Sequence, residues 1–248
     1  MTKLIAFFSL IAVALIASHA DAATQTISSA EQRAALIELY TSEGCSSCPP
    51  AERWLSGLKS DPRLWKHIVP VAFHVDYWNY LGWRDRFAEA RFSQRQRDYE
   101  RHDYLQTVYT PGVMKNGREW RGWSYTDMPA STHEDKAGVL KATLGADNAM
   151  VEFTPARRYR SPLVLNIALL GFDLTSHVAA GENAGKILRH DFVVLGFRQF
   201  RQAPHDGRYR WESSGFLNGA TARPSGIALW VTAADDPTPL QATGGWLK

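Results

Sequence analysis

The sequence has few cysteines, little net charge and no repetition. Its 248 residues contain only two cysteines, so a zinc site made of two cysteine pairs is excluded. The formal net charge at pH 7 is only +3, and in residues 84–103 the arginines are interleaved with acids, which is typical of a solvated helix face. We therefore expect no nucleic-acid partner. The chain also has no internal repeat and no low-complexity segment.

Apolar and aromatic side chains, in contrast, are abundant. Hydrophobic residues make up 45% of the chain and aromatic residues 12%, whereas charged residues make up 21%. This composition is sufficient for a packed core, and the length suits one large domain or two small ones. We therefore expect a folded globular protein.

The first residues have the pattern of a secretory signal. Lys3 precedes an apolar run at residues 4–17, which is too short to span a bilayer comfortably. Small residues follow and predict cleavage after Ala20 or Ala22. We therefore expect residues 1–22 to be a signal peptide, with a retained membrane anchor as the alternative.

Export has two consequences for the mature protein. No lipid-attachment cysteine lies near the cleavage site, so we expect a protein without a membrane anchor in the periplasm or outside the cell. These compartments are oxidising, and a disulfide between Cys45 and Cys48 can persist there.

The first half of the mature chain is predicted to alternate strands and helices. Residues 35–41 and 68–78 are apolar and β-prone, so both are predicted as buried strands. Between them, Pro49 fits the first turn of a helix, where its missing N–H costs nothing. The other predicted elements are a helical segment at 83–106, a hairpin at 108–123 with the turn Asn116–Gly117, and a last helix at 128–144.

The pattern changes near residue 150. From there on, short apolar stretches alternate with turns, and the segment 227–231 places apolar side chains at every second position. We therefore expect residues 150–248 to form an all-β, sandwich-like region packed on a first domain at 30–147.

The two cysteines permit three interpretations: a metal site, a structural staple or a redox pair. Metal sites need about four ligands, and the eight histidines are scattered, so we expect no metal; His74 is predicted to be a core residue. As a staple, the pair closes a loop so small that it constrains the unfolded chain little.

A redox pair is favoured by the position of the cysteines between a strand and a helix. The free N–H groups and the dipole of a helix N-terminus favour thiolate over thiol, and thiolate is the attacking species in disulfide exchange. Cys45 is therefore the predicted nucleophile, and Cys48, one turn into the helix, the resolving thiol. The nearby acids Glu43 and Glu52 oppose the stabilisation of the thiolate.

Thr110–Pro111 provides a second feature of this kind. The arrangement resembles the thioredoxin superfamily, in which a cis proline lies beside the cysteine pair and leaves a backbone edge open for substrate. The resemblance implies that Thr110–Pro111 is cis and that Pro111 lies close to Cys45. An ordinary trans turn is the alternative, since cis is the minority form of X–Pro bonds.

Three stretches narrow the resemblance further. The segments "ELYTSEGCSSCPPAE", "FHVDYWNYLGWRDRFA" and "VYTPGVMKNGR" together resemble domain-of-unknown-function family 1223, a thioredoxin-like secreted family, and "GENAGKILRHDFVV" resembles it as well. The likeness covers nearly the whole mature chain. It implies an α/β thioredoxin-like domain, with a central mixed sheet flanked by helices and a helical insertion, followed by a C-terminal β region. It brings no known substrate.

Other residues are candidates for supporting roles. Glu38 lies on the strand before the cysteines, where a buried acid of thioredoxin helps move the proton of the second thiol. Asp76, Tyr77 and Trp78 end the second strand, where α/β folds gather their sites. Together with Thr110, they are the predicted substrate-binding residues.

These features predict an exported thiol–disulfide oxidoreductase that uses Cys45 and Cys48, with Pro111 and Glu38 in the catalytic site. Its predicted substrate is a protein or a small thiol or disulfide, and it needs no cofactor. The alternative is a non-catalytic binding module on the same scaffold, in which the disulfide is structural. The sequence leaves the oligomeric state open.

Overall fold

A computed structural model describes residues 24–124, 135–146, 148–215, 220 and 222–247 of the chain. The predicted signal peptide, residues 1–22, lies outside this part. The described residues form fourteen strands, two α-helices and three short 3₁₀ turns. None of these helices is long and apolar enough to cross a membrane.

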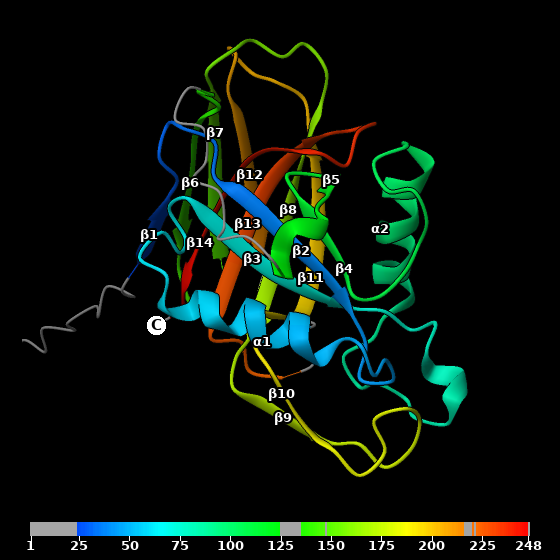
Figure 1. Cartoon of the computed structure of the whole chain (residues 1–248). Coiled ribbons are helices and arrows are strands. Elements are labelled where there is room, and N and C mark those ends of the chain that lie inside the picture. The colour runs from blue at the N-terminus through cyan, green and yellow to red at the C-terminus, as the bar shows by residue number, and fades with distance from the viewer. Residues whose placement is uncertain (1–23, 125–134, 147, 216–219, 221, 248) are drawn as a thin grey trace, which may run out of the picture.

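The largest element is a mixed sheet of eight strands (Figure 1). Its order is β14 (Pro239–Trp246), β13 (Gly226–Ala233), β8 (Leu163–Gly171), β11 (Val193–Gln202), β3 (Ile68–His74), β2 (Ala35–Thr41), β4 (Gly112–Lys115) and β5 (Arg118–Glu119). The strand β3 runs parallel to both β2 and β11, and the other pairs are antiparallel. Strands from both halves of the chain thus share one sheet.

A second sheet packs against the large one. It has four antiparallel strands in the order β1 (Gln25–Ser28), β6 (Gly138–Leu144), β7 (Asn148–Pro155) and β12 (Tyr209–Ser214). Alternate side chains of β8 and β13, such as Ile167 and Leu229, share a buried core with Leu140 and Phe153 of this sheet. The strands β9 (Leu174–His177) and β10 (Ile187–His190) form a separate hairpin.

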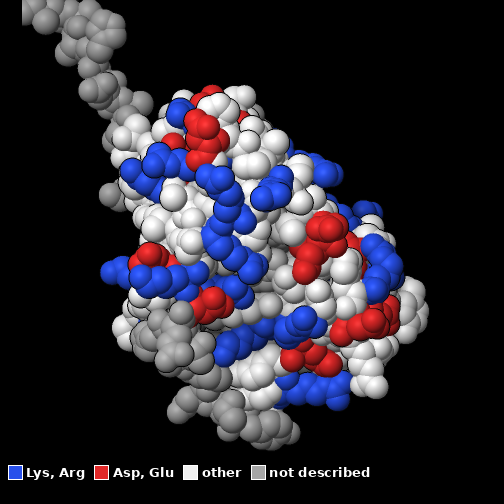
Figure 2. Space-filling model, turned by 90° about the horizontal axis from the view of Figure 1, so that it is seen from above, with Lys and Arg blue, Asp and Glu red and all other residues white. Residues whose placement is uncertain are grey.

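The two α-helices cover opposite faces of β2. Tyr99 of α2 (Ala90–Arg101) contacts Glu38, whereas Glu52 of α1 (Pro49–Gly57) contacts Thr41. Because side chains alternate along a strand, Glu38 and Thr41 point to opposite faces. The 3₁₀ turns are η1 (Leu58–Ser60), η2 (Asn79–Leu81) and η3 (Arg121–Ser124). On the surface shown in Figure 2, basic and acidic side chains lie among one another.

The predicted fold class is wrong, because the molecule is β-rich and is not a thioredoxin-like α/β domain flanked by helices. The strands β8, β11, β13 and β14 extend the central sheet and do not form a sandwich of their own. Residues 138–144, predicted as helix, are the strand β6. Alanine, leucine and lysine in this segment favour a helix. However, Leu140, Ala142 and Leu144 are buried at every second position, which is the period of a strand and not of a helix. In the rest of that predicted helix, residues 135–137 are not helical, and residues 128–134 lie outside the described residues.

Several local predictions are confirmed. The strand at 35–41, the helix beginning at Pro49 and the hairpin turn at Asn116–Gly117 are present. The predicted strand at 68–78 is present but ends at His74, so Asp76, Tyr77 and Trp78 follow it and are not part of it. From residue 148 on, the described residues contain strands and no helix. The predicted helical segment 83–106 is helical only at Ala90–Arg101. The predicted boundary between 147 and 150 falls at the start of β7, which pairs with β6, and a division there stays a prediction.

Candidate functional site

The two cysteines lie after the carboxyl end of β2, just before α1. They form a disulfide, and their Cα atoms are 5.5 Å apart, as predicted. Both cysteines are fully buried, whereas Ser46 and Ser47 between them are exposed. The exposed surface of this segment is therefore formed by the two serines and not by the sulfur atoms.

The start of α1 differs from the prediction in one respect. Cys48 is the N-cap residue and the helix begins at Pro49, so Cys48 does not lie inside it. Pro49 and Pro50 have no N–H, and the N–H groups of Ala51 and Glu52 both donate to the carbonyl of Cys48, at 3.0 and 3.2 Å. The first four positions of α1 therefore offer no unpaired N–H to a thiolate, contrary to the expectation for Cys45.

The loop between β9 and β10 covers the cysteine pair. The side-chain amide of Asn183 donates to the carbonyls of both Glu43 and Cys45, each at 2.9 Å. Next to it, the carboxylate of Glu182 accepts a hydrogen bond from the N–H of Ser46 at 2.8 Å. We call residues 182–183 the cap, because their contacts hold the backbone on both sides of Cys45.

Thr110–Pro111 is a cis peptide, as predicted. The Trp78 indole N–H donates to the Thr110 hydroxyl at 2.8 Å. Trp78 also packs against Gly44, where an added Cβ would lie only 3.0 Å from the Trp78 Cβ. Trp78 and Thr110 thus lie beside the loop that leads to Cys45, and the contact of Pro111 with the cysteines stays a prediction.

The other candidate residues lie toward α2. Glu38 is buried on the opposite face of β2 from α1, where its carboxylate accepts two hydrogen bonds from Arg95, at 2.8 and 3.0 Å. Glu38 is therefore not brought to the cysteines, because the alternation of β2 points it at α2. Asp76 accepts a hydrogen bond from the Ser93 hydroxyl at 2.5 Å, and Tyr77 donates to Gln96 at 3.1 Å. These contacts tie the end of β3 to α2, and a substrate role for Asp76 and Tyr77 stays a prediction.

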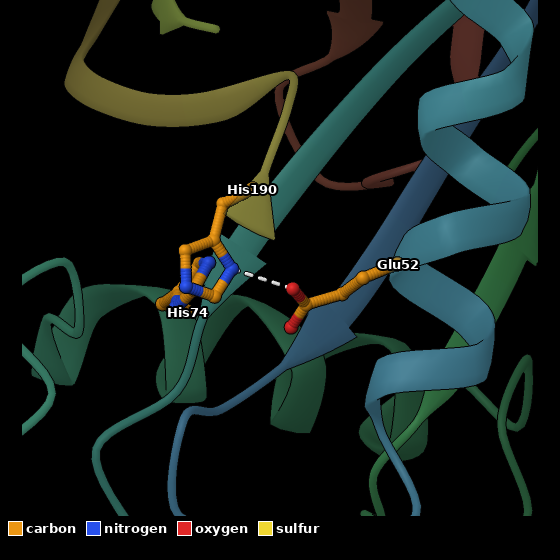
Figure 3. A group of neighbouring side chains, drawn as sticks. All are labelled: Glu52, His74 and His190. Atoms are coloured by element: carbon orange, nitrogen blue, oxygen red, sulfur yellow. Dashed lines mark hydrogen bonds and ion pairs between the residues drawn. The ribbon is translucent and has the colours of Figure 1, made fainter. Parts of the chain in front are cut away.

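A buried cluster of acids and imidazoles lies on the α1 face of the sheet. Glu52 of α1, His74 at the end of β3 and His190 at the end of β10 point toward one another in Figure 3. His190 Nδ1 lies 2.5 Å from Glu52 Oε2, and the two imidazole rings meet edge to face with centroids 5.2 Å apart. Glu43 and Asp85 complete what we call the α1-face cluster.

Carboxylates hold both imidazoles of this cluster. His74 Nδ1 lies 2.7 Å from Asp85 Oδ2, and His190 Nε2 lies 3.3 Å from Glu43 Oε1 without the alignment of a hydrogen bond. The Thr41 hydroxyl donates to Glu52 Oε1 at 2.5 Å. His74 Nε2 is buried and has no hydrogen-bond partner.

The cluster is electrostatically coupled. Burial alone would lower the pKa of His190, but hydrogen bonding and charge from Glu43 and Glu52 outweigh it and raise the pKa to about 10. Burial alone would raise the pKa of Glu52, but the hydrogen bond and charge of His190 lower it below its ordinary value. The α1-face cluster therefore favours the protonated, positively charged form of His190.

This cluster was not predicted from the sequence. Its members come from five separate segments, and each is an ordinary residue in its own segment. One signal was available: Glu43 and His74 lie at or just beyond the carboxyl ends of the parallel strands β2 and β3, where α/β sheets gather polar side chains. His190 gave no such signal, because only the tertiary fold brings the hairpin β9–β10 to α1.

Comparison with known proteins places the chain in a family and relates its fold to solved structures. The family model described as "Protein of unknown function (DUF1223)" matches residues 36–231. A structural-genomics crystal structure of a protein from Agrobacterium tumefaciens is 21% identical, with a TM-score of 0.63, over 87% of this chain and 95% of that chain. HBP35 of Porphyromonas gingivalis is 16% identical, with a TM-score of 0.59, over 88% of this chain and 76% of that chain. At these identities the likeness shows the fold alone. No curated protein is significantly similar to this chain.

Proposed function

The chain belongs to the DUF1223 family of proteins of unknown function, and we propose, from the site itself, that Cys45 and Cys48 are a redox-active pair that exchanges disulfides with a thiol or disulfide substrate. The observation that supports this most is a disulfide with the spacing C-x-x-C between a strand end and a helix start. Trp78 and Thr110, beside the loop that leads to Cys45, are the proposed substrate contacts. Export to the periplasm or the cell exterior is part of the proposal, because the pair must meet an oxidising environment.

The proposed thiol–disulfide exchange has two steps. In the reduced protein, the Cys45 thiolate attacks one sulfur of a substrate disulfide; that S–S bond breaks, a mixed disulfide forms, and the leaving thiolate takes a proton from water. Cys48 then loses its proton and attacks Cys45 Sγ, which forms the Cys45–Cys48 bond and releases the second substrate thiol. Two electrons pass to the substrate, and a donor thiol or dithiol must reduce the pair again by the reverse reaction.

The surroundings of the pair favour a reductant over a strong oxidant. A strong oxidant is one whose reduced form is stabilised. Here the first turn of α1 offers no unpaired N–H, and the acids Glu43 and Glu52 flank the pair in sequence. Because a Cys45 thiolate gains little stabilisation from these groups, the oxidised pair is favoured and its reduced form readily gives up electrons.

A structural disulfide is the second candidate, and one observation favours it. Both cysteines are fully buried, and the cap binds the backbone at Cys45 and Ser46. A pair that serves only stability needs no access, whereas a redox pair needs the cap to open.

Trapping the mixed disulfide separates the two candidates. A Cys48→Ala variant lacks the resolving thiol, so an adduct at Cys45 accumulates if Cys45 is the nucleophile. The folded, reduced variant is mixed with oxidised glutathione and the adduct is located by mass spectrometry, with Cys45→Ala as the matched control. We expect an adduct on Cys45 that forms faster than the adduct on Cys48 in the control. An adduct that appears only in denaturant would support the structural disulfide.

A further inference from the structure

We propose that Glu52, His74 and His190 form a binding site for a divalent transition-metal ion of the zinc class, buried between α1 and the ends of β3 and β10 (Figure 3). The site is separate from the disulfide and does not depend on the proposed redox function. It is a binding site that the sequence did not reveal.

The three side chains present their donor atoms to a common point. One donor atom from each lies within 4.8 Å of the other two, and all three residues are buried. The Glu52–His190 contact of 2.5 Å is a hydrogen bond, which an ion bound between Glu52 Oε2 and His190 Nδ1 would replace. Two imidazole nitrogens and one carboxylate oxygen are a donor set that zinc accepts, and three protein ligands leave the ion a further position.

The groups behind the three ligands have the arrangement found around metal-binding histidines. Such a histidine almost always has a carboxylate, carbonyl or water at its second nitrogen, which fixes the tautomer and the ring orientation. Here Asp85 lies 2.7 Å from His74 Nδ1, and Glu43 lies 3.3 Å from His190 Nε2. His74 therefore has an acid at Nδ1 and an unpartnered Nε2, and His190 has Glu43 at Nε2 and the proposed ligand Glu52 at Nδ1.

His74 provides an independent observation. Its side chain is fully buried, and its Nε2 has no hydrogen-bond partner. When Nδ1 donates to Asp85, Nε2 is an acceptor with a free lone pair. A buried acceptor without a partner is costly in free energy, and a metal ion at Nε2 removes that cost.

The charges of the cluster also call for a cation. It contains the three carboxylates of Glu43, Glu52 and Asp85 and two imidazoles. In the described part of the chain, the hydrogen bonds and ion pairs of these five side chains involve neither lysine nor arginine. Buried carboxylates need a counter-charge. Two imidazoles cannot balance three carboxylates even when both are protonated, and a divalent ion that replaces an imidazole proton supplies the missing charge.

Zinc binding to the full-length mature protein tests the site. The protein is kept oxidised, so that Cys45 and Cys48 stay in the disulfide and cannot act as ligands. Zn²⁺ binding is measured by calorimetry, and Co²⁺ serves as a spectroscopic probe of the ligand geometry. We expect one Zn²⁺ per chain and a visible Co²⁺ spectrum of nitrogen and oxygen ligation.

The variants separate ligands from bystanders. His74→Ala is expected to abolish stoichiometric binding, and Asp85→Asn to weaken it by about 10–100-fold, as the loss of an outer carboxylate does. His205→Ala removes an exposed histidine outside the cluster and is expected to leave binding unchanged. Circular dichroism confirms that each variant is folded. The proposal is overturned if the wild-type protein takes up no stoichiometric Zn²⁺, a result that needs no variant, or if folded His74→Ala binds as tightly as wild type.

Discussion

The strand β2 and its neighbour β3 have buried charged side chains on both faces, and the two groups differ in how their charges are balanced. On the α2 face, the carboxylate of Glu38 binds Arg95, Tyr40 and Tyr99. On the α1 face, Glu43, Glu52 and Asp85 have two imidazoles as their nearest cationic groups. One cluster contains a guanidinium of permanent charge, and the other contains groups whose charge depends on protons or metal.

The two groups also differ in how many of their polar atoms have a hydrogen-bond partner. The α2-face carboxylate accepts hydrogen bonds at both oxygens, and the Arg95 guanidinium lies 5.2 Å from the ring centre of Trp230 and 5.5 Å from that of Phe73. In the α1-face cluster, Glu43 Oε1, His74 Nε2 and His190 Nε2 have no hydrogen-bond partner. A buried network in which the polar atoms have hydrogen-bond partners stabilises the fold. Buried polar atoms without partners are typical of a site that binds a ligand or reacts.

The largest expected effect is on the α2 face. Arg95→Met removes the permanent cation and leaves the buried Glu38 carboxylate without its counter-charge, so the free energy of unfolding should fall by about 3–5 kcal/mol. Urea denaturation with the disulfide intact measures the change. The double variant Glu38→Gln and Arg95→Met should recover most of the loss, because a neutral amide can accept a hydrogen bond from one of the hydroxyls of Tyr40 and Tyr99 and donate one to the other. A single variant as stable as wild type would show that the ion pair is not what holds α2.

An intermediate effect is expected at the cap. Asn183→Ala removes the side-chain donor of the Glu43 carbonyl and one of the two donors of the Cys45 carbonyl, which also accepts from the N–H of Cys48. The free energy of unfolding should therefore fall by about 1–3 kcal/mol. If the cap controls access, dithiothreitol should also reduce the disulfide faster in this variant than in wild type.

The neighbouring Glu182→Gln serves as the matched control for Asn183→Ala. Its side chain contacts the exposed Ser46 and can still accept that hydrogen bond. We expect wild-type stability and a reduction rate close to wild type. If Asn183→Ala loses stability but is reduced at the wild-type rate, the cap does not gate the disulfide.

The smallest effect on stability is expected at Glu43. Glu43→Gln removes one of three clustered carboxylates and keeps an acceptor for the Trp83 indole N–H, which lies 2.6 Å from Glu43 Oε2. The free energy of unfolding of the metal-free protein should therefore fall by only about 1 kcal/mol, because His190 keeps its ion pair with Glu52 when Glu43 becomes neutral. The same substitution at Glu38 should cost several times more. If Glu43→Gln and Glu38→Gln lower the free energy of unfolding equally, the two faces of β2 do not differ in how their charges are balanced.

The sequence predicted the local elements of the site well. The strand before Cys45 and the helix at Pro49 follow from apolar patterning and from the preference of proline for the first turn. The resemblance of Thr110–Pro111 to a cis proline gave the peptide geometry correctly. These features depend on residues close together in the chain, and such residues determine local structure.

The sequence could not show how the second half joins the first. The described residues from 150 on form strands and no helix, as predicted, but apolar alternation does not say which sheet a strand enters. The pairing of β11 with β3 placed these strands in the central sheet. The same long-range packing brings His190 to Glu52, across 138 positions of the chain. Glu38 was predicted to lie near the cysteines but lies on the α2 face. A shift of one position along a strand reverses the face to which a side chain points, and the sequence does not fix that position.

The central claim, a redox pair that acts as a reductant, is tested most directly by a redox titration of the folded protein. The wild-type protein is equilibrated with mixtures of reduced and oxidised dithiothreitol or glutathione, the thiols are alkylated, and the fraction of reduced pair is read from the mass shift while circular dichroism reports the fold. We predict reversible reduction without unfolding, at a potential nearer to about −270 mV than to about −120 mV. Reduction only after the protein unfolds, or a potential near about −120 mV, would contradict this account.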